Sequence, residues 1–163
     1  MSLEAYEGAA LDNRFAHLTN ACVQKTHPEY KEHRGEHIWA LEDVEAALGV
    51  KIWDGAHEEL KRALGTIFAA SRDKLARKQG YFDLLGLDFM LDSDHRLHFL
   101  EVNSNPAMWT DSSPVLQELV PRLLATSLDT VLAAQKPGAG VITAPAPFEL
   151  IVDEATGFRY GSA

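Results

Sequence analysis

The alternation of apolar and polar residues is clearest between residues 81 and 106, where it predicts two antiparallel strands joined by a short turn. The turn Asp92-Ser93-Asp94-His95 separates two apolar runs. Pairing the runs around this turn places Phe89 opposite His98. Asp88 then falls opposite Phe99. Because successive side chains of a strand point to opposite faces, one face is expected to carry the apolar residues Leu85, Leu87, Phe89, Leu100 and Val102.

The other face of this strand pair carries three oxygen-bearing side chains, Asp88, Glu101 and Asn103. Gly86 is expected opposite Glu101, where it leaves room for a ligand. Magnesium prefers such oxygens, and phosphate oxygens would complete its shell. The alternative is an ordinary hairpin with one solvent-exposed face, on which Asp88 and Glu101 are simply hydrated and bind no ligand. Apolar residues on the same face argue for a largely buried face, where carboxylates need partners or a metal: Leu84, Met90, Leu97 and Phe99.

Two helices are predicted before this strand pair. Residues 41–48 form a short helix that ends at Gly49, and residues 58–79 form an amphipathic helix that ends at Gly80. The second helix carries a cluster of cations: Lys61, Arg62, Arg72, Lys74, Arg77 and Lys78. We favour a solvated helix face with its cations near the C-terminal end, and a docking patch is the alternative.

A third helix follows the strand pair. Ser113 is its expected cap, Pro114 lies in its first turn, and Pro121 is expected to kink or restart it. Its apolar stripe is formed by Leu116, Leu119, Val120, Leu123, Leu124, Leu128, Val131 and Leu132. Residues 137–147 have the composition of a linker, and residues 148–160 predict a small hairpin that turns at 154–157. Mixed helices and antiparallel strands make the fold class α+β.

The N-terminal part has weaker patterns. Residues 14–25 alternate around Phe15, His17 and Thr19 and predict a strand that ends near Asn20, whose side chain can cap the local backbone. Residues 26–39 read as a polar loop. The loop histidines His27, His33 and His37 invite a zinc hypothesis, but the absence of a helical apolar stripe favours solvent-exposed loop side chains.

Composition bounds the class of protein. The 163 residues suit one soluble domain with a sizeable core. The net charge of −9 argues against a nucleic-acid partner. No run is long enough to span a membrane, and no secretory signal is expected. Cys22 is the single cysteine, which fits a reducing compartment and a small apolar packing role. The chain has no glycine-rich phosphate loop and no serine-nucleophile motif.

Three blocks in order, HLTNACVQK, FDLLGLDFMLD and EVNSNPAMWT, resemble the tubulin tyrosine ligase-like family. The resemblance spans about residues 14–132 and fits the C-terminal half of that family's ATP-grasp catalytic domain. The SNPA continuation, the pattern QK-x-x-P-x-Y around Lys25, and Trp39 resemble most the polyglycylase branch.

The resemblance implies roles for individual residues. Asp88, Glu101 and Asn103 match the family's catalytic magnesium ligands, which bridge the phosphates of ATP. A second set matches positions near bound ATP: His17, Thr19 and Asn20. Lys25 matches a lysine that helps to hold the incoming amino acid.

The activity that the resemblance implies is ATP- and Mg²⁺-dependent ligation of an amino acid, with glycine expected, to glutamate side chains through an acyl phosphate. The implied acceptor is tubulin or another glutamate-rich protein, and the implied location is the cytoplasm, with association to microtubules, cilia or axonemes. Asn105 and Trp109 are further candidates for shaping the pocket, and turn or packing roles explain them equally well.

The chain also departs from the family pattern, because only 16 residues precede His17 and the family's N-terminal lobe lies upstream of that block. Residues 1–136 are therefore expected to form a partial catalytic domain, with residues 137–163 as a linker and short hairpin tail. The chain is not expected to ligate by itself. The alternative function is a non-catalytic module that binds microtubules or another protein.

Overall fold

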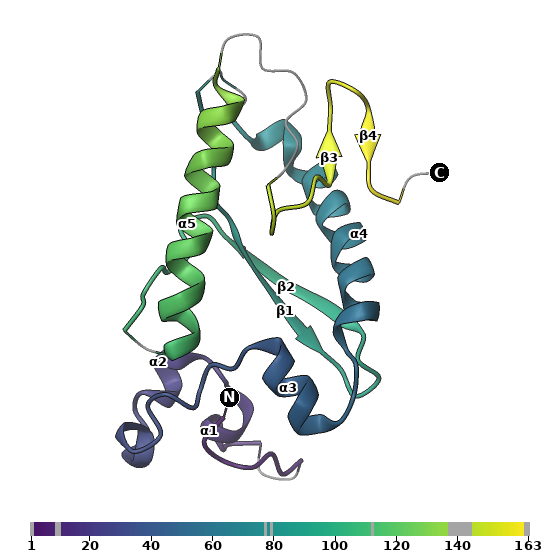
Figure 1. Cartoon of the computed structure of the whole chain (residues 1–163). Helices are drawn as coiled ribbons and strands as arrows, with labels where there is room; N and C mark the ends of the chain where they lie inside the picture. The colour runs from purple at the N-terminus through teal and green to yellow at the C-terminus, as the bar shows by residue number, and fades with distance from the viewer. Residues whose placement is uncertain are drawn as a thin grey trace. The chain divides into compact units, whose positions relative to one another are not determined.

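The computed structural model describes residues 2–8, 11–76, 78, 80–111, 113–136 and 145–161. Helices and antiparallel strand pairs are mixed along the chain, so the α+β class is confirmed (Figure 1). The backbone divides into two compact units, one of residues 1–49 and 108–121, the other of residues 50–107 and 122–163. Each unit is described by itself below.

The first unit begins with two short helices, α1 (Arg14–His17) and α2 (Ala21–Gln24), where a strand was predicted. That prediction is wrong because two asparagines start helices here. The Asn13 side chain accepts hydrogen bonds from the backbone N–H groups of Phe15 (3.1 Å) and Ala16 (3.3 Å). Asn20 accepts one from Cys22 at 2.8 Å. N-cap bonds of this kind satisfy the first free amides of a helix, and they outweigh a brief apolar alternation.

The rest of the first unit follows the sequence pattern more closely. The predicted polar loop contains one 3₁₀ turn, Pro28–Lys31. The short helix α3 (Leu41–Leu48) is confirmed with its bounds, and Gly49 ends it in the left-handed conformation at φ 67°. A residue without Cβ reaches that conformation without strain.

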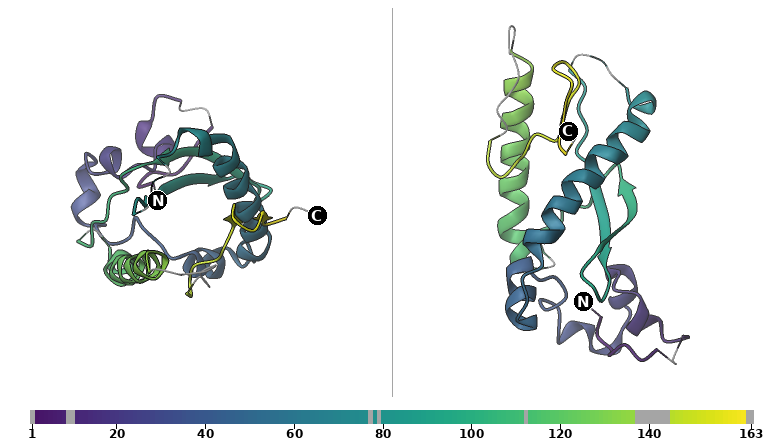
Figure 2. Two further views of the ribbon diagram at one scale, coloured as in Figure 1. Left: turned by 90° about the horizontal axis from the view of Figure 1, so that it is seen from above. Right: turned by 90° about the vertical axis from the view of Figure 1, so that its right-hand side faces the viewer.

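In the second unit, helix α4 (Trp53–Ser71) starts earlier and ends earlier than predicted. A 3₁₀ turn, Arg72–Lys74, follows it, and Gly80 lies in a separate turn at φ 84° rather than at the helix end. The predicted amphipathic character of α4 is confirmed, because Leu64 and Ile67 on its apolar side line the same apolar cavity as the strand residue Leu87. Helix α4 contacts β2, and the right-hand view of Figure 2 shows it crossing the strand pair at an angle.

The predicted strand pair is confirmed as β1 (Gly86–Leu91) and β2 (Leu97–Asn103), but its predicted register is wrong. Asp88 lies opposite Glu101 and Phe89 opposite Phe99, so Leu100 is an extra residue, a β-bulge in β2. The turn is also longer than predicted. The backbone N–H of Asp92 donates to Arg96 O at 3.1 Å, and His95 adopts φ 59°. A three-residue loop whose last residue is left-handed is a favoured hairpin connection.

Helix α5 (Pro114–Ala134) begins as predicted, with the Ser113 hydroxyl accepting a hydrogen bond from Val115 N at 3.1 Å. It continues through Pro121 as one helix, so the predicted restart does not occur. Residues 122–134 of α5 belong to the second unit.

The predicted C-terminal hairpin is confirmed as β3 (Val152–Asp153) and β4 (Phe158–Arg159), and its turn contains Gly157 at φ 75°. Of the linker predicted over residues 137–147, residues 137–144 lie outside the described residues. Arg77 of the predicted basic cluster also lies outside them. No helix among the described residues is long and apolar enough to cross a membrane.

The cores of both units are small. Among the described residues the buried apolar side chains are Ala16, Ile52, Ala56 and Val120, while large apolar side chains such as Leu128 and Leu132 are exposed. Four polar or charged residues are also buried: Gln24, Glu45, Lys61 and Ser113. Buried polar side chains are therefore as numerous as buried apolar ones among the described residues.

Candidate functional site

The candidate metal face is formed by Asp88 on β1 and by Glu101 and Asn103 on β2. Asp88 and Glu101 are directly opposite each other in the ladder. The Asn103 Nδ2 atom lies 3.4 Å from Asp88 Oδ2 and 3.5 Å from Glu101 Oε1. The structure therefore brings the three predicted side chains together on one face of the hairpin, with Asn103 bridging the two carboxylates.

The chemistry of this trio suits a hard divalent cation. Like charges directly opposite each other on neighbouring strands repel, so a bound cation would relieve the contact between Asp88 and Glu101. A half rotation of the Asn103 amide would direct its oxygen toward the two carboxylates, giving three oxygen donors that suit Mg²⁺. Both acids are exposed, which leaves room for phosphate oxygens. Within the described residues, no group of three His, Cys, Asp or Glu side chains is placed to hold a metal, and this trio contains an amide.

Two expectations about the surroundings of the trio are wrong. Gly86 lies opposite Asn103 and not opposite Glu101. A Cβ atom at Gly86 would lie 2.9 Å from Pro106 Cβ, so this glycine accommodates a close packing contact rather than a ligand gap.

The face is also not largely buried. The longer turn shifts the pairing of the outer half of β2, which places Phe99 opposite Phe89 with ring centroids 5.6 Å apart. By the same pairing Leu97 lies opposite Leu91, on the apolar face. Met90 remains beside the acids and is 56% exposed. The trio is thus a solvent-facing set of donors.

The turn that joins the two strands is fixed by Asp92. Its Oδ1 accepts hydrogen bonds from the backbone N–H groups of Asp94 and Arg96, both at 2.9 Å. Its Oδ2 lies 2.9 Å from His98 Nε2. These contacts, with that to His98 as the largest cause, lower the pKa of Asp92 to about 2. The carboxylate therefore stays charged and holds the hairpin end that carries the trio.

The second predicted set lies in the first unit. His17 is the last residue of α1, and its ring meets Tyr6 edge-on at 5.1 Å between centroids. Asn20 caps α2, which agrees with the capping interpretation, although it caps a helix and not a strand end. Thr19 lies in the exposed link between the two helices. Lys25 is the exposed C-cap of α2.

The sequence reading missed Gln24, which organises this segment. Its side chain is 1% exposed and belongs to the residue just before Lys25. Its Nε2 donates to Phe15 O at 2.9 Å and Leu18 O at 2.6 Å, and its Oε1 accepts from Leu3 N at 3.1 Å. A glutamine at the end of a short helix reads as a surface residue, so no signal in the sequence distinguishes it.

The remaining candidates have local structural partners. His27 Nε2 lies 3.1 Å from Glu4 Oε1, and His33 Nδ1 lies 2.8 Å from Glu36 Oε2. The ring of His37 stacks on Tyr30 at 4.6 Å. Cys22 is exposed, so the prediction that it packs as a small apolar residue is wrong; the N-capped start of α2 turns it to solvent.

The fold and the hairpin face define an α+β protein with oxygen donors on an antiparallel strand pair. Comparison with known proteins identifies it further: the chain belongs to the tubulin-tyrosine ligase family, whose sequence model matches residues 1–139. No solved structure gives a significant match.

Similar proteins carry several names. An inactive polyglycylase, TTLL10 of Homo sapiens, is 35% identical over 127 residues, which cover 71% of this chain and 19% of that protein. The protein polyglycylase TTLL10 of Macaca fascicularis is 32% identical over 127 residues, covering 71% of this chain and 20% of its own length. A probable tubulin polyglutamylase, TTLL9 of Rattus norvegicus, is 33% identical over 126 residues, which cover 75% of this chain and 27% of that protein. The matches therefore span about a quarter or less of these relatives.

Proposed function

We propose that this chain carries part of the machinery of an ATP- and Mg²⁺-dependent ligase that joins an amino acid to glutamate side chains of an acceptor protein. The observation that carries the proposal is the convergence of Asp88, Glu101 and Asn103 on one exposed hairpin face. Membership of the tubulin-tyrosine ligase family supports it. Relatives named polyglycylases support glycine as the amino acid, and one named a tubulin polyglutamylase supports tubulin as the acceptor.

In this proposal each residue has a defined task. Asp88, Glu101 and Asn103 hold Mg²⁺, which when bound neutralises the charge that develops on the ATP phosphates. His17, Thr19 and Asn20 lie near ATP, and Lys25 helps to hold the amino acid. Residues 1–136 supply these groups, and residues 137–163 are a linker and tail.

The proposed reaction needs no nucleophile from the protein. An acceptor glutamate carboxylate attacks the γ-phosphorus of ATP, which forms an acyl phosphate and releases ADP. The amine of free glycine then attacks the acyl carbon, the phosphate group leaves, and an isopeptide bond remains. Positioning and charge neutralisation are the main demands of such phosphoryl transfer. A role on glutamate-rich proteins of the cytoskeleton, in the cytoplasm or in cilia, follows from the proposed acceptor.

A magnesium titration of the full chain, with and without a non-hydrolysable ATP analogue, tests the site. We expect nucleotide to increase magnesium affinity, and Asp88→Asn or Glu101→Gln to weaken it at least about tenfold, because each removes a charged ligand. Asp94→Asn is the matched control, since this exposed acid lies in the turn of the same hairpin. Equal affinity in the Asp88 and Glu101 variants and in the unchanged chain would refute the site.

A second function is a non-catalytic module that binds microtubules or another protein. One observation favours it: the human relative is named inactive, and it is as similar to this chain as relatives named polyglycylases. Because the chain is not expected to ligate by itself, binding separates the two. Magnesium binding that requires nucleotide and is lost in Glu101→Gln supports the ligase, whereas tubulin binding without any nucleotide-dependent magnesium binding supports the module.

A further inference from the structure

Within the predicted basic cluster Lys61 is buried, whereas the other described cations are exposed: Arg62, Arg72, Lys74 and Lys78. Lys61 and Arg72 contact the C-terminal part of the same chain. We call residues 145–161 the strap. The strap contains the hairpin β3–β4 and lies outside residues 1–139, which match the family. The helix that it contacts lies inside that range. The strap therefore lies on a surface of the family-matched part of the chain.

Lys61 is the centre of the contact. It is 8% exposed, its Nζ lies 3.3 Å from Glu149 Oε2 of the strap, and it lies 4.2 Å from the ring centroid of Tyr160. Glu58, one helical turn earlier, lies 2.9 Å from Lys61 Nζ and accepts a hydrogen bond from the Tyr160 hydroxyl. His57 Nε2 also lies 2.8 Å from Glu149 Oε1. Two strap residues, Glu149 and Tyr160, thus contact three polar side chains of α4: His57, Glu58 and Lys61.

The contact continues along the helix. Arg72, in the 3₁₀ turn that follows α4, lies 3.5 Å from Glu154 Oε1 of the strap. Arg159 of β4 donates to Thr66 Oγ1 at 3.2 Å and lies over Gly65, where an added Cβ would be 3.4 Å from Arg159 Nε. The strap therefore follows α4 from His57 to Arg72 and pairs its two glutamates with cations.

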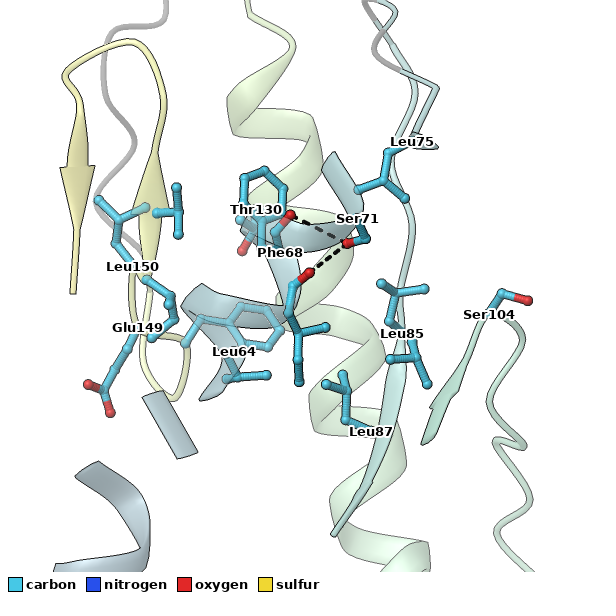
Figure 3. Close-up of a pocket in the computed structure, with 15 residues that line it drawn as sticks. Leu64, Phe68, Ser71, Leu75, Leu85, Leu87, Ser104, Thr130, Glu149 and Leu150 are labelled. Atoms are coloured by element: carbon cyan, nitrogen blue, oxygen red, sulfur yellow. Dashed lines mark hydrogen bonds between the residues drawn. The ribbon is translucent and has the colours of Figure 1, made fainter. Parts of the chain in front are cut away.

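Between these polar contacts an apolar cavity remains between the strap and the residues that it covers. Leu150 of the strap, Leu64 of α4 and Leu87 of β1 line one apolar cavity of about 670 Å³ (Figure 3). The hydroxyls at its wall bond to helix carbonyls, Ser71 to Ile67 O at 2.8 Å and Thr130 to Thr126 O at 2.7 Å. Glu149 turns its carboxylate away from the cavity (Figure 3). Walls of an unfilled cavity lose packing contacts, so the strap gains less from its apolar residues than a better-fitting segment would.

We propose that this surface of α4 is a docking site for an extended peptide that alternates apolar and acidic residues, and that the strap is its built-in competitor. The strap displays the chemistry that the surface accepts, with Glu149 and Glu154 on cations and Leu150 over the cavity. On the proposed function, whose acceptor is rich in glutamate, the natural occupant is an acidic segment of that acceptor protein.

If the strap competes with an added peptide for the α4 surface, it lowers the apparent affinity of the chain for that peptide. While the strap occupies the surface, a peptide added in solution binds only to the fraction of molecules whose strap is released. The probe is a fluorescein-labelled peptide with the sequence of residues 147–160, and its anisotropy is measured on the full chain without nucleotide or metal. Loosening the strap with Glu149→Gln and Tyr160→Phe leaves α4 unchanged, and we expect it to tighten probe binding by about tenfold.

Two further comparisons test the surface itself. In the loosened background Lys61→Met should weaken probe binding, whereas Lys74→Met, a cation outside the strap contacts of the described residues, should not. A probe with amides in place of Glu149, Asp153 and Glu154 should bind the loosened, otherwise unchanged chain more weakly, and this result does not depend on the folding of a Lys61 variant. Binding of the charged probe should also weaken as salt is raised.

Equal binding to the loosened and the original chain, or equal binding of charged and amide probes, would overturn the proposal. Both readouts are independent of magnesium and ATP. Loss of the metal site with intact probe binding would therefore refute the ligase and leave the docking surface, and the reverse result would refute only the docking surface. A competing glutamate-rich peptide from tubulin then tests the proposed source of the occupant.

Discussion

Two regions that carry the candidate site residues are held in opposite ways. The segment from His17 to Lys25 is organised from inside, because the buried Gln24 side chain bonds to three backbone groups. The trio Asp88, Glu101 and Asn103 stands on an exposed hairpin face, where two carboxylates oppose each other. The first region has an internal hydrogen-bond network, whereas in the proposed function the second is the region that a cation would stabilise. Internal hydrogen bonds position one set of groups, and the strand ladder positions the other.

The largest effect expected from this comparison is on the Gln24 region. Gln24→Leu removes three hydrogen bonds and leaves the Leu18 carbonyl and the Leu3 N–H without the Gln24 partner, while Phe15 O keeps the Ser2 hydroxyl, so we expect a loss of about 3 kcal/mol in the stability of the first unit. Hydrogen exchange of the Leu18 amide should accelerate, while amides of β1 and β2 should not. Gln117→Leu, an exposed glutamine of α5, is the control. Equal protection of the Leu18 amide in Gln24→Leu and the original chain would contradict the assignment.

A smaller effect is expected from packing at the base of the hairpin. Gly86→Ala places a methyl group against the rigid Pro106 ring, 2.9 Å from its Cβ, and should cost about 2 kcal/mol in hairpin stability. Gly55→Ala in α4 meets no atom within 4 Å and should be neutral or stabilising. Urea unfolding followed by strand-pair amide signals measures both. If the two substitutions behaved alike, Pro106 would not constrain the hairpin.

Removing one of the two opposed carboxylates should change hairpin stability in opposite directions without and with magnesium. Without magnesium, Asp88→Asn should stabilise the hairpin by about 0.5 kcal/mol, because it removes a like-charge pair across the strands. With magnesium and nucleotide the same variant should be the less stable one, since it loses a ligand. Asp94→Asn in the turn should show no such reversal. A variant that is destabilised in both conditions would mean that Asp88 serves the fold and not a cation.

The smallest effect is expected from pH at the hairpin turn. The folded pKa of Asp92, about 2, lies below its ordinary value of 3.8, so its contribution is fully present above that value and is lost as pH falls through 2. The Arg96 amide should therefore stay protected at pH 4 and lose protection near pH 2. His98→Gln should raise the Asp92 pKa, because His98 is the largest cause of the shift. An NMR titration of the Asp92 carboxyl carbon that was the same in both proteins would exclude this contact.

The sequence predicted elements where a periodic pattern, a helix cap or a turn signal agreed with the final environment. The strand pair, α3, the start of α5 and the C-terminal hairpin were all predicted, and the trio was predicted to share a face. The register was not, because neither the third turn residue nor the bulge at Leu100 leaves a mark in a period-two pattern. The longer turn moves Phe99 and Leu97 to the apolar face, and the bulge keeps Glu101 on the face of Asp88.

Two other errors have tertiary causes. The N-terminal strand prediction failed because cap bonds from Asn13 and Asn20 decide the local structure, and a short alternation cannot reveal them. The exposed cations after Lys61 agree with a solvated face, but Lys61 itself does not, because its partner Glu149 in the strap lies 88 residues further along the chain. Gln24 and Lys61 show the same limit, since the burial of a polar side chain depends on partners that the local sequence does not contain.

The most direct test of the central claim is to locate a bound divalent ion on the full chain by NMR. Mn²⁺ substituted for Mg²⁺, in the presence of a non-hydrolysable ATP analogue, broadens signals near the ion. We expect selective broadening of the amides of Asp88, Glu101 and Asn103, and we expect it to be lost in the double variant Asp88→Asn with Glu101→Gln. Broadening centred instead on Asp92 and Asp94 in the turn, or unchanged in the double variant, would contradict it.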